Sequence, residues 1–419
     1  MSGPALAGRR RTLVLCFVLA LFAAAFRLPR LGEPPTLVFD EAAFVPTAFQ
    51  YIQGQQPYEA AHPPLAKLLI AAGIFYLGSD PWGWRMAPAL AGILLAPVFF
   101  LMARRALANE RAALLAASVL LLDDLYLALS RLAMTNTFAV LFSVAAGYFL
   151  LGAVSEERLS ARSLLAAAFF MGLALATRWS SLAIGGFLAA VLCVARGRRL
   201  LRARERGLLL ASAAVVAATY AASFGPLLAQ GHPPGELVQL HRLMLRFHAT
   251  TDAPHPYASA WYTWPWLYRP PLYYYEPTGP AGERIVMVMA IGNPAVWWLS
   301  VPASLLALAW GLRRRDPRAL FGATGFAVAY LAWGLAPRRL HFSHYFYEAL
   351  PYACLCLGFL LGQAESIRAR RLVGLYLAIT AVLFLFFYPV ATAVPIPSAW
   401  FYHRLFANVY PWRWFPSWY

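Results

Sequence analysis

The chain has 419 residues, of which 61% are hydrophobic and only 13% are charged. Soluble domains are about 45–50% apolar and about 25% charged, so this composition excludes a soluble domain and predicts a membrane protein. The formal charge is +17, from 35 Lys and Arg against 18 Asp and Glu. Because the arginines cluster between apolar runs, we attribute this charge to cytoplasmic loops, and we expect no nucleic-acid partner.

Apolar runs long enough to cross about 30 Å of hydrocarbon recur along the chain. The first follows Arg9, Arg10 and Arg11, but no small-residue cleavage site ends it, so we interpret it as an uncleaved helix and not a signal peptide. We therefore expect an all-α polytopic membrane protein with eleven spans, at about 12–28, 85–103, 110–129, 133–152, 163–178, 180–195, 207–228, 293–312, 318–335, 345–362 and 372–390.

The arginine clusters predict which side of the membrane each connection occupies. With the N-terminus in the cytoplasm, every Arg-rich connection is cytoplasmic, as the positive-inside bias requires. The apolar run 62–78 is left out of the count because Pro63, Pro64 and Lys67 favour an interfacial helix. Counting it as a span would move nearly all of these clusters outside. We expect a multi-pass protein of a bacterial inner membrane, in contact with its lipids.

Three long segments then lie on the extracytoplasmic side of a single domain, 1–419: the first outer loop 29–84, a large fourth outer loop 229–292 and the tail 391–419. Residues 235–250 in the large loop have the apolar spacing of an amphipathic helix, which we expect to lie on the bilayer. The four cysteines all fall inside apolar runs, so we expect neither a disulfide framework nor a thiolate metal site.

The first outer loop carries the residues best suited to chemistry. Asp40 and Glu41 form a carboxylate pair just beyond the first span, and a general base with a positioning neighbour is what transfer to a hydroxyl requires. A solvated pair of loop acids is the alternative. Further on, His62 and Lys67 flank two prolines at the membrane surface. Lys67 either snorkels to the interface or contacts a lipid phosphate.

Charged residues also occur at the outer ends of later spans. Asp123 and Asp124 end the third span and Arg131 follows, while Arg85 opens the second span and Arg178 closes the fifth. Burying such groups costs about 2.5 kcal/mol or more, so they indicate either function or a structural Asp–Arg ion pair. Carboxylates and cations gathered at one leaflet suit a phosphate leaving group and a nucleophile that needs a base.

The large outer loop contains four histidines, His232, His241, His248 and His255. They have no strong metal-ligand spacing, so a metal site is an alternative and a surface helix is the favoured interpretation.

Taken in order, the motifs resemble the protein O-mannosyltransferase family, integral-membrane glycosyltransferases of the C-type fold. The resemblance covers nearly the whole chain. Its motifs are Phe39-Asp40-Glu41, His62-Pro63-Pro64-Leu65-Ala66-Lys67, Arg85-Met86-Ala87-Pro88-Ala89-Leu90, Leu122-Asp123, Ser130-Arg131, Ala176-Thr177-Arg178-Trp179-Ser180, His255-Pro256-Tyr257-Ala258-Ser259, Trp264-Pro265-Trp266, Arg269-Pro270, Tyr273-Tyr274-Tyr275, Gly292-Asn293-Pro294, Trp297-Trp298 and Trp414-Phe415-Pro416-Ser417-Trp418.

The resemblance implies transfer of mannose from polyprenyl-phosphate mannose to Ser or Thr hydroxyls of an exported polypeptide, met with or without the secretion machinery. It implies inversion by single displacement, with no obligatory cofactor or metal. By the same resemblance, Asp40 is the general base beside Glu41. The donor-phosphate residues are Arg131, Lys67, His62 and Arg178, the supporting residues are Asp123, Asp124, Arg85 and Asn136, and the acceptor groove contains His255, Tyr257, Trp261 and Asn293.

The chain departs from the family pattern at three positions. Ala43 stands where the family often has His, Asn136 where it often has Asp, and Arg178 where it usually has Lys before Trp. Arg keeps the positive charge but presents a planar fork. These departures leave the acceptor and the sugar open.

Two alternatives to this function remain. A relative that transfers another lipid-linked sugar, such as aminoarabinose or a pentose, to an envelope lipid or glycan usually carries Lys-Pro-Pro where this chain has His62-Pro63-Pro64. A lipid or solute transporter would place charges near the midplane and show a repeat. Here the charges gather at one face, and we find no repeat, which favours an enzyme.

Overall fold

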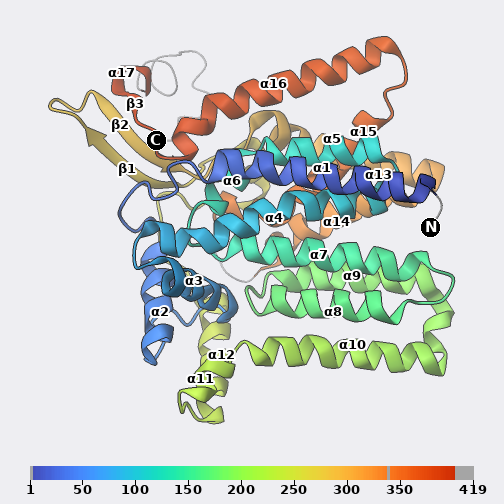
Figure 1. Cartoon of the computed structure of the whole chain (residues 1–419), viewed down its shortest axis with the longest axis horizontal. Coiled ribbons are helices and arrows are strands. Elements are labelled where there is room, and N and C mark those ends of the chain that lie inside the picture. The colour runs from blue at the N-terminus through green and yellow to red at the C-terminus, as the bar shows by residue number, and fades with distance from the viewer. Residues whose placement is uncertain (1–2, 337–339, 402–419) are drawn as a thin grey trace.

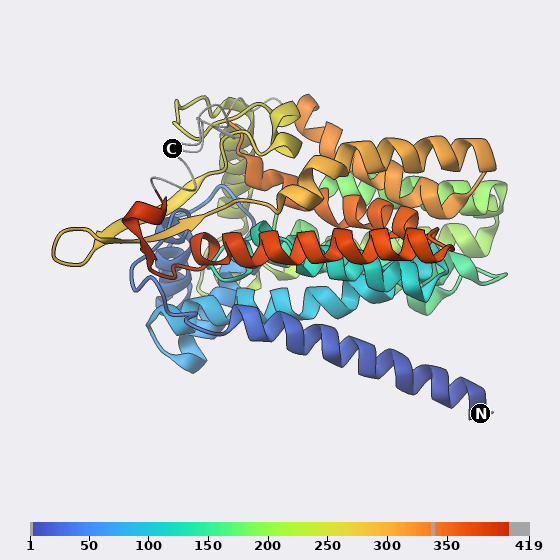
Figure 2. The ribbon, with the colours of Figure 1, turned by 90° about the horizontal axis from the view of Figure 1, so that it is seen from above.

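The structure is a computed structural model that describes residues 3–336 and 340–401, apart from the side chains of residues 3–7. Long helices run side by side in one bundle, and shorter elements cover one of its ends (Figures 1 and 2). The bundle helices are α1 (Gly3–Arg27), α4 (Pro81–Leu107), α5 (Glu110–Leu121), α7 (Asn136–Ser155), α8 (Ala161–Leu175), α9 (Ser181–Arg196), α10 (Ala203–Ala222), α13 (Pro294–Arg314), α14 (Pro317–Leu335), α15 (Leu350–Gly362) and α16 (Ile367–Ala391).

Within the described residues, six helices are long and apolar enough to cross a membrane, or seven if the bent pair α5 and α6 (Asp124–Ser130) is one span. Helices α8 and α15 are apolar but shorter. Every predicted span lies on a helix of the bundle, so a multi-pass membrane protein is confirmed. The total of eleven crossings stays a prediction.

Several bundle helices begin where the sequence provides a cap followed by proline. The side chains of Asp80, Asn293 and Asp316 each accept a hydrogen bond from a backbone N–H in the first turn of α4, α13 and α14. Proline at the first helical position needs no donor and has a helical φ already. The Asx-Pro dipeptides therefore set the starts of these three helices.

The third predicted span, 110–129, is not one straight helix. The chain bends by 64° between α5 and α6. Asp123 lies at the bend, where its carboxylate accepts hydrogen bonds from Tyr126 N, Asn293 N and Trp297 Nε1. The continuous helix was wrong because Asp123 serves as the cap of α6 and joins it to the start of α13.

Short elements at the covered end include helices in both loops where they were predicted. Helices α2 and α12 cross the end of the bundle instead of following its axis (Figure 1). The short helices are α2 (Glu41–Gln53), α3 (Leu65–Leu77), α11 (Gly225–Ala229), α12 (Pro234–Thr250) and α17 (Ser398–Trp400), with 3₁₀ turns η2 (Trp261–Trp266) and η3 (Ser343–Glu348) at this end and η1 (Gly197–Leu201) between α9 and α10.

The all-α expectation missed a small antiparallel sheet at the same end. Strands β1 (Leu272–Thr278), β2 (Arg284–Met289) and β3 (Ile396–Pro397) lie in the order β1-β2-β3. Tyr275 pairs with Met287, and Ile285 pairs with Ile396, which ties the sheet to the chain after α16. The aromatic run of Tyr273, Tyr274 and Tyr275 lies in β1, and aromatic residues favour strands. The tail motif after residue 401 lies outside the described residues.

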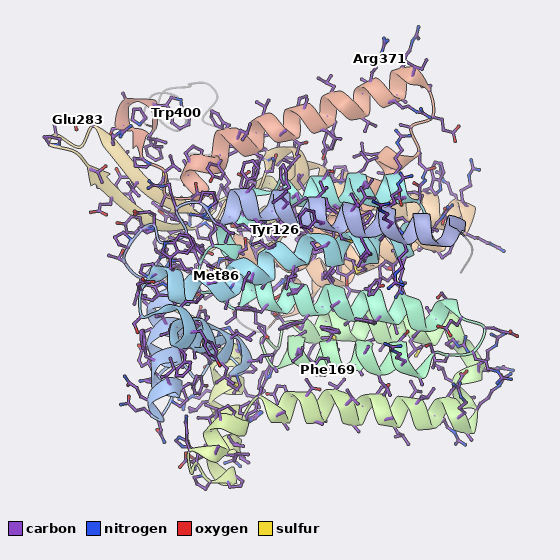
Figure 3. The ribbon with its side chains drawn as sticks, viewed as in Figure 1. Met86, Tyr126, Phe169, Glu283, Arg371 and Trp400 are labelled. Carbon is purple, nitrogen blue, oxygen red and sulfur yellow. The ribbon has the colours of Figure 1, made fainter. Side chains whose placement is uncertain are left out.

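The two ends of the bundle differ in charge and structure. Glu283, at the tip of the β1–β2 hairpin, and Arg371, near the start of α16, mark these opposite ends (Figure 3). Because the helices alternate in direction, the Arg-rich connections all fall at the end that carries Arg371. The short helices and the sheet fall at the other.

This arrangement predicts which end of the bundle faces the cytoplasm, and labelling of introduced cysteines can test that orientation. In a variant lacking the two cysteines that are not buried, Cys16 and Cys193, we would introduce Tyr58→Cys or Arg198→Cys. A maleimide that cannot cross membranes should label Tyr58→Cys in intact cells and Arg198→Cys only after the cells are opened. Equal labelling of both in intact cells would contradict the topology.

Candidate active site

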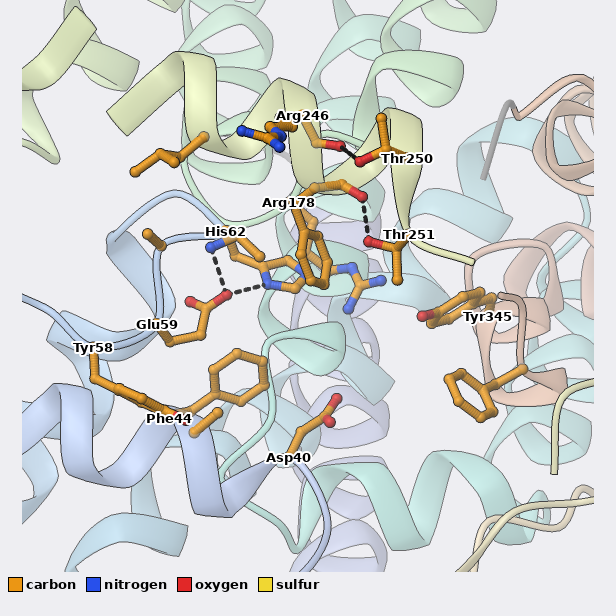
Figure 4. Close-up of a pocket in the computed structure, with 16 residues that line it drawn as sticks. Asp40, Phe44, Tyr58, Glu59, His62, Arg178, Arg246, Thr250, Thr251 and Tyr345 are labelled. Carbon is orange, nitrogen blue, oxygen red and sulfur yellow. Dashed lines mark hydrogen bonds and ion pairs between the residues drawn. The ribbon is translucent and has the colours of Figure 1, made fainter. Parts of the chain in front are cut away.

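A cavity of about 630 Å³ opens at the covered end of the bundle, between the first outer loop, α12 and η3 (Figure 4). Asp40 and Arg178 both point into it (Figure 4). The lining residues are Asp40, Ala43, Phe44, Tyr58, Glu59, Ala60, Ala61, His62, Arg178, Leu243, Arg246, Phe247, Thr250, Thr251, Phe342 and Tyr345. The carboxylates of Asp40 and Glu59 and the guanidinium groups of Arg178 and Arg246 thus line a space large enough for a sugar phosphate.

Asp40 owes its position to the strained residue before it. Phe39 has a φ of 50°, a left-handed conformation that is costly for a bulky side chain. Its ring stacks on Tyr273 with centroids 4.2 Å apart, which holds the turn. Asp40 then begins α2 as its N-terminal flanking residue, with a half-buried side chain that lines the cavity.

Glu41 points the other way, into a buried ion pair with Arg85. Its Oε2 accepts from Arg85 Nη2 at 2.8 Å and from Val38 N at 3.0 Å. Its Oε1 accepts from Arg85 Nε at 2.9 Å and from Ala133 N at 2.7 Å. Neither Glu41 nor Arg85 is exposed. With four donors already bonded, Glu41 is held inside the fold, whereas Asp40 lines the cavity.

The remaining N–H groups of Arg85 hold the first outer loop. Nη1 donates to the carbonyls of Leu31 and Pro34, and Nη2 donates to that of Thr36. All five guanidinium N–H groups are therefore bonded. Removing one partner of such a buried pair typically costs about 3–5 kcal/mol, so the pair fixes the loop that carries Asp40.

Arg178 is held at the cavity wall by neutral and acidic partners. Its Nη1 donates to Thr135 Oγ1 at 3.0 Å and to Asn136 Oδ1 at 3.3 Å. Its Nε lies 3.6 Å from Glu348 Oε1, and Glu348 also accepts a hydrogen bond from Ser180 Oγ. Asn136 therefore supports Arg178, and the guanidinium is only partly neutralised beside the cavity.

His62 and Lys67 belong to a cluster centred on Glu59, which the sequence analysis missed. Lys67 Nζ donates to Glu59 Oε2, to the carbonyl of Glu59 and to the carbonyl of His62. His62 Nδ1 lies 2.9 Å from Glu59 Oε1. All three Lys67 donors are used, and Lys67 is absent from the cavity lining, whereas His62 and Glu59 line it.

The cluster changes the acidity of its members. Burial alone would raise the pKa of Glu59, but the charges and hydrogen bonds of His62 and Lys67 outweigh burial and lower that pKa to about 2. Burial lowers the pKa of His62, so the imidazole is neutral at pH 7. Glu59 and Lys67 therefore form the charged pair, with His62 as a neutral neighbour facing the cavity.

The Arg131 guanidinium is buried against backbone carbonyls near the end of α1. Its Nη1 donates to the carbonyls of Arg27 and Pro29, and its Nη2 donates to that of Arg30. These carbonyls follow the end of α1, where a cation complements the helix dipole. Arg131 is 3% exposed and absent from the cavity lining, and its contact with the donor phosphate stays a prediction.

The paired acids after α5 are also buried. Asp123 joins α6 to α13, as described above, and the Asp–Arg ion pair considered as an alternative is not formed with Arg131. Asp124 is fully buried, and neither carboxylate oxygen has a hydrogen-bond partner among the described residues. Neither acid lines the cavity.

The four residues predicted for an acceptor groove do not gather in one groove. His255 packs edge-on against Phe342 of the cavity, and Tyr257 N donates to His255 Nδ1. Trp261 packs on Tyr330 between η2 and α14. Asn293 is fully buried, and its Nδ2 donates to the carbonyls of Leu122 and Thr380. Its part in an acceptor groove stays a prediction.

Three histidines of the large loop each form a hydrogen bond to a different partner. His241 bonds Tyr220, His248 bonds the carbonyl of Ala61, and His232 bonds Glu236. Among the described residues, no group of three or more His, Cys, Asp or Glu could hold a metal ion. The absence of an obligatory metal or cofactor stays a prediction.

Five residues of the site were missed: Glu59, Arg246, Tyr273, Tyr345 and Glu348. Glu59 precedes His62 by three residues, a spacing that could have indicated a pair. Tyr273 is buried with no hydrogen-bond partner for its hydroxyl in the described chain, and burial together with the charge of Asp40 raises its pKa. The others come from segments whose approach to the first loop depends on the tertiary fold.

Comparison with known proteins identifies the family. Models described as dolichyl-phosphate-mannose-protein mannosyltransferase match residues 17–84 and 61–222, and one described as the C-terminal four-helix membrane region of protein O-mannosyltransferase matches 234–418. The fold and these matches define a polytopic membrane glycosyltransferase. The chain belongs to the protein O-mannosyltransferase family.

Relatives match over nearly the full length. The polyprenol-phosphate-mannose–protein mannosyltransferases of Mycolicibacterium smegmatis and Mycobacterium tuberculosis are each 28% identical, over 96% and 98% of this chain and 92% of each relative. The Saccharomyces cerevisiae protein O-mannosyltransferase Pmt1–Pmt2 complex bound to the sugar donor matches with TM-score 0.79, 15% identity and coverage of 92% and 90%. ArnT of Cupriavidus metallidurans bound to undecaprenyl phosphate matches with TM-score 0.62, 18% identity and coverage of 90% and 65%. The two solved structures share the fold.

The Glu59 cluster predicts a pH-dependent stability. The folded-state pKa of Glu59, about 2, lies below its ordinary value of 4.5, so its contribution is present above pH 4.5 and is lost as the pH falls through 2. Glu59→Gln should lower the thermal midpoint in detergent at pH 7, and the difference from the wild type should shrink toward pH 2. The exposed Glu283→Gln is the control. A pH-independent difference would contradict the ion pair.

Proposed function

We propose that this chain transfers a mannosyl residue from polyprenyl-phosphate mannose to Ser or Thr hydroxyls of exported polypeptides. The observation that carries the proposal is the convergence of Asp40 and Arg178 in one cavity at the end of a membrane bundle. A base for the hydroxyl proton and a cation for the departing phosphate are the two groups that this reaction needs. The family and the names of the full-length relatives support the sugar and the acceptor class.

The reaction is a single displacement with inversion at the sugar carbon. The acceptor oxygen forms a bond to C1 of mannose while the bond from C1 to the phosphate oxygen breaks, and its electron pair leaves with the polyprenyl phosphate. Asp40 takes the hydroxyl proton as the new bond forms. Glu41 takes no part in proton transfer because its oxygens are bonded to Arg85 and two backbone N–H groups.

Arg178 stabilises the negative charge that develops on the leaving phosphate. The guanidinium lines the cavity and lies 3.6 Å from Glu348, which restrains it. Arg246 of α12 lines the same cavity and adds a second positive charge. The lipid-linked donor enters from the bilayer, and the two guanidinium groups bind its phosphate at the level where the chain leaves the membrane. The arginines carry this role in the proposal without a metal or cofactor.

The proposed setting is the inner membrane of a bacterium, with the cavity on the extracytoplasmic side. The Arg-rich end of the bundle then faces the cytoplasm. The exported polypeptide reaches the cavity from water, during or after passage through the secretion machinery. Transfer of another lipid-linked sugar would use the same base and the same guanidinium, and the labelled donor in the assays below separates it from mannosyl transfer.

Removing the proposed base should abolish transfer with little change in fold. General-base catalysis contributes about 10²–10⁴-fold, so Asp40→Asn should lower kcat for labelled polyprenyl-phosphate mannose by about 100-fold or more. The thermal midpoint should stay close to that of the wild type because Asp40 is only half-buried. Glu283→Gln, at the hairpin tip, is the matched control. Wild-type kcat in Asp40→Asn would rule out this base.

Substitutions of Arg178 and Arg131 distinguish an arginine that binds the donor phosphate from one that stabilises the fold. A charge-assisted hydrogen bond contributes about 1.5–3 kcal/mol, so Arg178→Gln should lower kcat/KM for the donor by about tenfold or more. Arg131→Gln should lower the thermal midpoint, because three carbonyls lose their donors, and should leave the donor KM of the folded fraction unchanged. The reverse pattern would assign the phosphate to Arg131.

A further inference from the structure

A second cavity, of about 150 Å³, lies beside the catalytic one. The two cavities share Ala60 of the first outer loop and Leu243 of α12 as lining residues, so only a common wall separates them. The smaller cavity is lined by Gln56, Pro57, Ala60, Leu227, His232, Glu236, Leu237, Gln239, Leu240 and Leu243.

The lining of this second cavity divides into an apolar part and a polar part. Leu227, Leu237, Leu240 and Pro57 supply aliphatic surface, which favours an aliphatic ligand group. Gln56, Gln239, His232 and Glu236 supply the polar groups, with His232 Nδ1 and Glu236 Oε2 2.7 Å apart. The Glu236 side chain is 39% exposed, so this part is in contact with water. The volume is suited to one side chain and not to a second sugar phosphate.

We infer that the second cavity is an acceptor subsite, which binds an aliphatic side chain of the polypeptide near the hydroxyl residue that is glycosylated. This inference rests on the proposed function, since it places that hydroxyl at Asp40 in the neighbouring cavity. Side chains on one face of an extended chain recur about every 6.6 Å, two residues apart. Adjacent cavities therefore take residues two to four positions apart in one extended segment.

A polypeptide fits this place better than the prenyl chain of the donor. A prenyl chain has no polar group to pair with Gln56, Gln239 or the exposed carboxylate of Glu236, and covering that carboxylate with hydrocarbon would be costly. The main chain of an extended peptide supplies N–H and C=O groups for such a rim. The cavity also lies against α12, which crosses the end of the bundle (Figure 1).

The second cavity is also distinct from the acceptor groove predicted around residues 255–261. His255 contacts Phe342, and Phe342 packs against Tyr345. Tyr345 and Tyr58 lie on opposite sides of the catalytic cavity (Figure 4). The second cavity adjoins the loop that carries Tyr58, because Gln56 and Pro57 line it. The polypeptide therefore has a binding element on the α12 side, which the sequence motifs did not indicate.

The test compares two exposed neighbours on α12, one lining the cavity and one outside it. Gln239→Trp should fill the second cavity, whereas Val238→Trp adds the same ring at a residue that is 53% exposed and does not line it. The acceptors are two synthetic peptides with a central Thr. One carries Leu at the second to fourth positions on both sides, and the other carries Gly there. KM and kcat are measured for each peptide and for the labelled donor.

The wild type and Val238→Trp should prefer the Leu peptide by about tenfold in kcat/KM, the order expected for burial of one aliphatic side chain. Gln239→Trp should lose this preference and keep the donor KM. A wild type without a preference, or a Gln239→Trp that retains it, would overturn the subsite. A raised donor KM in Gln239→Trp alone would assign the cavity to the prenyl chain. Absence of mannosyl transfer to both peptides by the wild type would instead refute the proposed function.

Discussion

The buried ion pair between Glu41 and Arg85 is the interaction on which the site depends. Two of the five N–H groups of Arg85 donate to Glu41, and the other three donate to carbonyls of the first outer loop. Glu41 accepts two further hydrogen bonds from backbone N–H groups, and neither side chain of the pair is exposed. A buried pair gains little stability over apolar packing, but losing one partner is costly. Its contribution is therefore geometric: it fixes the loop 31–38 and the start of α2, and so directs the next carboxylate, Asp40, into the cavity.

The charged residues of this end divide into those satisfied by the fold and those open to a substrate. Arg131, Lys67 and Asp123 are hydrogen-bonded to carbonyls, to Glu59 or to backbone N–H groups. Asp40 and Arg178 line the cavity. Because the surroundings are apolar helices with a low dielectric, a guanidinium held in place acts strongly on a nearby phosphate. In the proposed reaction, Asp40 and Arg178 carry the chemistry.

Much of the fold followed from the sequence, because apolar run length and the arginine bias are local signals that a membrane imposes on every span. The bend at Asp123 did not follow, since the partners of its carboxylate, Asn293 and Trp297, are about 170 residues away in the chain. In the site, Asp40, His62 and Arg178 were predicted and line the cavity. Arg131 was expected at the donor by motif alone, and only tertiary structure shows which atoms its donors reach. Glu59 and Glu348 were missed for the same reason.

A structure of the protein with polyprenyl-phosphate mannose, or a non-transferable analogue, bound in lipid nanodiscs would test the central claim most directly. The donor phosphate should lie within hydrogen-bond distance of the Arg178 guanidinium, with C1 of the sugar facing the Asp40 carboxylate across the space left for a hydroxyl. A phosphate bound instead by Arg131 or Lys67, or a sugar remote from Asp40, would contradict it.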